Sequence, residues 1–169
     1  RSSAFGSVAR ALLAVAAGLT ALAPPASAAK ARWSITRDIS PPQVERRLSS
    51  PAIAYSRDAL HIVFKDVHIF HMRSVDGGRT WSYPRRISGP NLANGAPCIH
   101  ADEDGIHVAY PAQVTEQETR YFQLFYTRSA DNGETFTAPS RLTDTSAQVR
   151  TPRFLPLSQG FALLYYEVE

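Results

Sequence analysis

The sequence predicts an all-β protein that is built from repeated four-stranded antiparallel units. Two observations lead to this prediction. First, the octet Ser74–Trp81 recurs as Ser129–Phe136, 55 residues later (129 − 74), and the match continues downstream without a gap. Second, Pro51, Pro97 and Pro152 are each followed, nine residues later, by a short apolar run that is rich in branched and aromatic residues. Short apolar runs between turn-forming residues predict strands joined by hairpins.

Each full unit is expected to contain four strands. In the first unit we expect them at 52–56, 60–65, 67–73 and 81–87, and in the second at 97–101, 106–111, 120–128 and 136–142. The third unit begins at Pro152 and has two strands before Glu169, and Gln113 to Thr119 is expected to form an enlarged loop in the second unit. Four-stranded units of about 40–50 residues are the blades of a β-propeller. The predicted blades are 46–90, 95–143 and a partial blade at 150–169.

One further segment fits the repeat. Trp33–Ser40 matches Trp81–Ser88 almost residue for residue, as a fourth strand without the three that should precede it. This arrangement is found where the N-terminus of a propeller supplies the outer strand of the last blade and closes the ring. A ring needs at least four blades, and at roughly 50 residues per blade the chain holds about two and a half. We therefore expect a truncated part of a longer, six-bladed propeller.

Residues 1–28 are predicted to be a secretory signal peptide. The apolar run Ala11–Ala23 lies between Arg10 and Ala26-Ser27-Ala28, which places small residues where a signal peptidase cleaves. The run is shorter than the ~20 residues that a membrane-spanning helix needs. An uncleaved anchor or a core helix is the alternative. The prediction implies a secreted or periplasmic protein whose mature part, 29–169, has no contact with a membrane.

Composition excludes several classes of function. The net charge is only +3 and no basic-aromatic surface is evident, so nucleic acid is not an expected partner. The single cysteine, Cys98, excludes an internal disulfide and any CxxC motif, and it is expected to be a small buried side chain. The five histidines lack the spacing of a metal site, and His61 and His107 share one repeat position, which indicates a role in blade packing. We expect neither a cofactor nor a metal.

The Ser-x-Asp-x-Gly-x-Thr-Trp octet resembles the Asp box, or BNR repeat, of the sialidase (neuraminidase) superfamily. The resemblance covers Trp33–Glu169 and implies the propeller fold. The role of the box is structural, because the carboxylates of Asp76 and Asp131 can accept backbone N–H bonds inside the tight turn. Trp81 and Phe136, which end the two octets, are expected to pack back over their own hairpins.

The resemblance also implies a site at the strand ends opposite the Asp boxes. Sialidases of this fold bind the substrate carboxylate with three arginines, and they use an acid/base Asp and a Tyr nucleophile that a Glu assists. Ser49 and Gly95 stand where the first two blades would carry the first arginine, and only the third blade has an arginine there, Arg150. The Tyr is expected in later blades. The candidate residues are Asp66 for catalysis and, for substrate binding, Arg46, Arg47, Arg150 and Glu167.

These observations lead to three functional hypotheses. The first is a secreted sialidase-like propeller that binds or hydrolyses the terminal acidic sugars of glycans, an exo-α-sialidase-like glycoside hydrolase if it is active. The second is a non-catalytic Asp-box propeller that binds a glycan or a protein. The third is a gene fragment without activity of its own. Two further arginines and a Tyr in a longer chain would favour the first hypothesis.

Neighbouring blades are expected to pack on one another through Ile62 and Phe64 of the first blade and Val108 and Tyr110 of the second. The first and third blades would then each expose an apolar face, which favours association of the chain. A full-length protein with a closed ring is expected to be a monomer.

Overall fold

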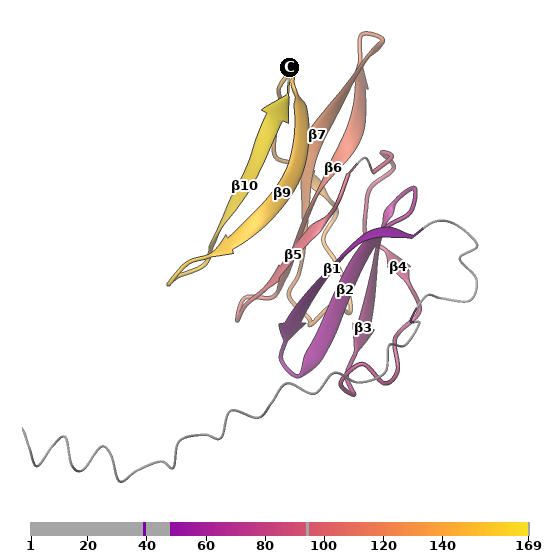
Figure 1. The fold of residues 1–169 in the computed structure, drawn as a ribbon, viewed down its shortest axis with the longest axis vertical. Helices are drawn as coiled ribbons and strands as arrows, with labels where there is room; N and C mark the ends of the chain where they lie inside the picture. The colour runs from indigo at the N-terminus through magenta and orange to yellow at the C-terminus, as the bar shows by residue number, and fades with distance from the viewer. Residues whose placement is uncertain (1–38, 40–47, 94, 169) are drawn as a thin grey trace, which may run out of the picture. The chain divides into compact units, whose positions relative to one another are not determined.

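The computed structural model describes residue 39, residues 48–93 and residues 95–168 (Figure 1). They form three antiparallel sheets. The first contains β1 (Ser49–Ser56), β2 (Ala59–Lys65), β3 (Ile69–Ser74) and β4 (Arg85–Arg86), in that order. The second contains β5 (Cys98–Ala101), β6 (Ile106–Glu116), β7 (Thr119–Ser129) and β8 (Ser140–Arg141), and the third pairs β9 (Gln148–Pro156) with β10 (Phe161–Val168).

The prediction of an all-β chain with sheets of four antiparallel strands is confirmed. No closed ring is present within the described ranges. The predicted signal peptide, Arg46 and Arg47 lie outside the described residues, as does the predicted closing strand apart from Ile39. No helix among the residues that the structure describes is long and apolar enough to cross a membrane.

Two strand predictions are corrected. Gln113 to Thr119 is not an enlarged loop, because β6 and β7 remain paired as far as Glu116 and Thr119. Only Gln117 and Glu118 form the turn, both with positive φ (46° and 68°), as in the two-residue turns whose twist matches a hairpin. The predicted fourth strands are also shorter than expected, at two residues each in β4 and β8.

Both Asp boxes form the turns between the third and fourth strands, as predicted. Asp76 Oδ1 accepts hydrogen bonds from the backbone N–H of Thr80 (2.9 Å) and from the Ser74 hydroxyl (2.8 Å), and Asp131 is bound in the same way by Thr135 and Ser129. Hydrogen bonds to the ionised form, with those from the threonine side chains first, hold the pKa of both carboxyls well below its usual range.

The aromatic residues that end the two boxes behave differently. Trp81 packs over its own hairpin, and its indole N–H donates to the Gly78 carbonyl (3.2 Å). Phe136 instead packs against the first sheet, where its ring lies edge-on to His71 with 4.9 Å between centroids. The expectation for Phe136 was therefore wrong, because the second Asp box lies beside the neighbouring sheet and its ring is used between the sheets.

The main core lies between the first and second sheets. Its side from the first sheet includes Val63 and Ile69, and does not include Ile62 and Phe64. Val108 and Tyr110 of the second sheet do pack into this core, as predicted. The error has a simple cause. Alternate residues of a strand face opposite sides, and equivalent positions of a repeat face the same direction along the stack. Ile62 is equivalent to Val108 (108 − 62 = 46), so the two cannot face each other.

Candidate functional site

The first strands of the three sheets surround a hollow of about 300 Å³. Its lining comes from the same repeat position in each sheet, namely 50–52 of β1, 96–99 at β5 and 151–154 of β9. Each of these segments includes its repeat proline. The repeat therefore brings together three segments that lie about 50 residues apart in the chain.

Two of the three segments have an unusual backbone at the entry to the hollow. Ser50 and Thr151, each directly before a repeat proline, have φ values of 54° and 45°. Positive φ is uncommon for residues other than glycine. In β1 it coincides with a shift in register between Ser49 and Ala52. Bulges of this kind redirect side chains and recur beside functional sites, as does backbone strain.

Among the described residues that line the hollow, Arg153 is the only charged one. It is exposed and directly follows the repeat proline Pro152. Arg153 is not among the candidates predicted from the sequence, although its place in the repeat was a usable signal. The equivalent residues are Ala52 and Cys98, so a charge appears at this position only in the third unit. None of the described lining residues is acidic, so the hollow favours an anionic ligand.

Arg150 lies beside this hollow but is not part of its lining. Its guanidinium carbon is 4.9 Å from the centre of the Phe122 ring on β7, a cation–π contact. This contact joins the third sheet to the second. The position of Arg150 is therefore explained in part by packing between sheets.

Asp66 lies in the turn between β2 and β3 and does not line the hollow. The strand directions place it at the opposite end of β3 from Asp76. Its backbone N–H donates to the His68 carbonyl (3.0 Å), and among the described residues its carboxylate has no hydrogen bond or ion pair. The described residues thus give Asp66 no partner that would fit it for acid/base work.

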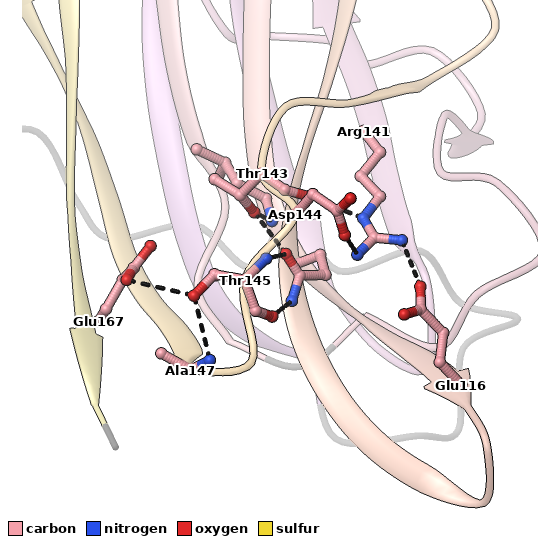
Figure 2. A network of polar contacts seen from close by, with 9 residues as sticks. Glu116, Arg141, Thr143, Asp144, Thr145, Ala147 and Glu167 are labelled. Carbon is pink, nitrogen blue, oxygen red and sulfur yellow. Dashed lines mark hydrogen bonds and ion pairs between the residues drawn. The ribbon is translucent and has the colours of Figure 1, made fainter.

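Glu167 belongs to a polar network that links the second and third sheets (Figure 2). Its carboxylate accepts a long hydrogen bond from the Thr145 hydroxyl (3.4 Å). The centre of the network is the buried Gln123, whose amide donates to the Thr145 carbonyl (2.6 Å) and accepts from the Thr143 hydroxyl (2.8 Å). Arg141 extends the network through ion pairs, each 2.6 Å long, with Glu116 and Asp144.

The contacts of Cys98, His61 and His107 indicate structural roles for these three side chains. Burial raises the pKa of the Cys98 thiol to about 12, so it stays protonated and unreactive at neutral pH. His61 forms a hydrogen bond (3.2 Å) with Asn132, in the second Asp box. The ring centroids of His107 and Phe161, which belongs to the third sheet, are 4.6 Å apart. Both histidines thus pack against the next sheet, as their shared repeat position predicted. No group of three potential metal ligands occurs in the described part of the chain.

No family model and no curated protein matches this sequence. The two octets that the sequence repeats also share one local geometry. Both boxes have the same carboxylate-centred turn at the same place in a four-stranded sheet.

Proposed function

We propose that the protein is a secreted sialidase-like propeller module that binds the terminal acidic sugars of glycans in the hollow between β1, β5 and β9. One observation supports the proposal: the equivalent starts of three strands line one hollow, and Arg153 is the only charged side chain that its described residues provide. Secretion is inferred from residues 1–28 of the sequence.

The chemistry of the lining suits an acidic sugar. A guanidinium binds a carboxylate through two parallel hydrogen bonds, which a neutral sugar cannot accept in the same way. Ser50 and Thr151, the two lining residues with positive φ, have hydroxyl side chains that can form hydrogen bonds with sugar hydroxyls. The prolines provide apolar surface for the ring.

Binding can be measured by NMR titration or calorimetry with the methyl α-glycoside of N-acetylneuraminic acid, with methyl galactoside as the neutral comparison. Arg153→Ala is expected to weaken binding of the acidic glycoside at least tenfold, about the 1.4 kcal/mol of one charge-assisted contact. Arg85→Ala is the matched control, because Arg85 is an exposed arginine on β4, outside the hollow. Equal affinity for the two glycosides, or an unchanged affinity in Arg153→Ala, would refute the proposal.

Hydrolysis is the second candidate, and the resemblance to sialidases favours it. A fluorogenic sialoside tests it separately from binding. We expect no release of the fluorophore, because the described residues give Asp66 no catalytic partner. Release that is lost in Asp66→Asn would show instead that the protein is a glycoside hydrolase.

A further inference from the structure

The strand β9 carries a β-bulge where it borders the hollow. Arg150 pairs with Tyr166 of β10, and Arg153 pairs with Leu164. The chain therefore advances three residues on β9 (153 − 150) against two on β10 (166 − 164), which leaves one extra residue on β9. An extra residue of this kind bends the strand and increases its local twist.

The backbone of this bulge is strained. Thr151 has a φ of 45°, although it is β-branched and directly precedes Pro152. A β-branched residue rarely adopts positive φ, and a residue before proline is normally extended. β1 has the same combination at the equivalent position, with positive φ at Ser50 and a register shift between Ser49 and Ala52. Strain of this kind persists where the surrounding structure enforces it, and it clusters at functional sites.

Packing against the second sheet does not require the extra residue. Val149 and Phe154 both pack against that sheet, and they lie five residues apart (154 − 149), on either side of the bulge. Residues on one face of a regular strand lie an even number of positions apart. Without the extra residue the two side chains would be four positions apart (5 − 1) and would still share a face. The bulge is thus an insertion into a strand that would pack in the same way without it.

The bulge does matter for Arg153. Phe154 and its cross-strand partner Leu163 face the second sheet. Arg153 is paired with Leu164, which is 54% exposed, so in a straight strand Arg153 would stand on the face away from the second sheet. It nevertheless lines the hollow together with segments of β1 and β5. A bend directly before Arg153 accounts for this position.

We infer that Thr151 is a positioning residue for Arg153, because the bulge that it forms directs the guanidinium into the hollow. This inference rests on the proposed function, since it takes Arg153 as the group that binds the acidic sugar. It adds that the preference for an anion depends on a backbone conformation as well as on the presence of an arginine. The equivalent bulge of β1 is followed by Ala52, so it places no charge in the hollow.

Deletion of Thr151 tests the inference, because it removes the bulge and keeps Arg153. The packing described above predicts that the fold is retained, which circular dichroism checks. The readout is the ratio of the affinities for the methyl α-glycoside of N-acetylneuraminic acid and for methyl galactoside. We expect the deletion to lower this ratio about tenfold, as Arg153→Ala does. In the deletion variant, Arg153→Ala should then have almost no further effect, because both changes remove the same contact.

The matched control is Thr151→Gly. Glycine adopts positive φ readily and occurs at such positions in bulges, so this variant lacks the same hydroxyl but keeps the bulge. Its ratio of affinities should equal that of the unmodified protein. Thr151→Pro is a second test that leaves the length of the chain unchanged. Proline fixes φ near about −65° and cannot form this bulge, so Thr151→Pro should lower the ratio as the deletion does.

The possible outcomes separate the inference from the proposed function. An unmodified protein that binds both glycosides equally would refute the proposed function, and the inference with it. If the unmodified protein prefers the acidic glycoside, and the deletion and Thr151→Pro keep both this preference and the effect of Arg153→Ala, the inference alone is overturned. Loss of the preference in Thr151→Gly would also overturn it, since the hydroxyl would then be responsible. Loss of the folded circular dichroism in both the deletion variant and Thr151→Pro would overturn it as well, because the bulge would then serve the fold itself.

Discussion

The protein should lose stability on acidification at pH values well above those at which carboxylates titrate, because a histidine pair is buried between the first two sheets. His71 is 2% exposed and His61 is fully buried, and their ring nitrogens are 3.1 Å apart. Burial, followed by the charges of His61, Arg73 and Arg85, lowers the pKa of His71 to about 3. Burial also lowers the pKa of His61. The His71 ring is therefore neutral in the folded protein at pH 5, whereas in the unfolded chain it is protonated.

The sign and size follow from linkage. A depressed histidine pKa means that the unfolded chain binds more protons, so stability is complete above pH 6.5 and is lost as the pH falls below it. With a pKa of about 3 in the folded state and 6.5 in the unfolded state, His71 alone should lower the free energy of unfolding by ~2 kcal/mol between pH 7 and pH 5. His61 acts in the same direction. The Asp-box carboxylates add little in this range, because an unfolded Asp titrates near pH 3.9.

The assay is urea denaturation at pH 7, 6 and 5, with tryptophan fluorescence as the readout. His71→Tyr is the informative variant, because Tyr126 occupies the same repeat position in the second sheet and hydrogen-bonds His107 there (2.7 Å). It removes one titrating ring and offers His61 a similar partner. Between pH 7 and pH 5, the free energy of unfolding of the variant should fall by ~2 kcal/mol less than that of the unmodified protein. Equal losses, or a gain in stability on acidification, would show that the pair is not held neutral.

Three further substitutions and one control substitution test the packing and the Asp-box turn, each by denaturation of the purified variant at pH 7. Gly133→Ala should lower the free energy of unfolding by about 2–4 kcal/mol, because φ is +84° and the new Cβ would lie 2.8 Å from His71 Cε1. The control is Gly77→Ala, where φ is +71° but no atom lies near the new Cβ, and it should lower the free energy of unfolding by only ~1 kcal/mol. Asp131→Ala should lower the melting temperature by several degrees, on the order of 5 °C, since the box turn loses its acceptor; an unchanged value would deny the box a structural role. Val63→Ala should cost about 2–3 kcal/mol, because the side chain is fully buried, and a cost below ~0.5 kcal/mol would place the core elsewhere.

The strand order and the Asp-box turns could be predicted because their signals are local. A carboxylate followed four residues later by a threonine brings its own hydrogen-bond partner within the turn, as Asp76 and Thr80 do. The two-residue turn at Gln117–Glu118 gave no such signal, because neither residue is a glycine or an asparagine, which usually supply positive φ. The sequence therefore suggested a loop where two long strands continue.

The site was harder to predict, because it depends on where three distant segments meet. Asp66 and Glu167 were chosen by analogy with sialidases, and the structure places neither in the hollow. Arg153 does line it, at a repeat position that is otherwise Ala52 or Cys98. The proposed site is thus marked by a residue that departs from its repeat equivalents, and the analogy did not select that residue. Arg153 can be chosen only if it is known that the first strands of the three sheets meet at one hollow. The pairing of strands within each sheet does not reveal this.

The repeat also explains why acid should act unequally on the two contacts between sheets. At the first contact, every charged or titratable neighbour that shifts the pKa of His71 lowers it, in the same direction as burial. At the second, the equivalent of His71 is Tyr126, which does not gain a proton, and Asp102 opposes the lowering of the His107 pKa by burial. Protonation therefore places an uncompensated charge in the first contact and a paired one in the second. The first and second sheets should separate at a pH where the second and third still hold together.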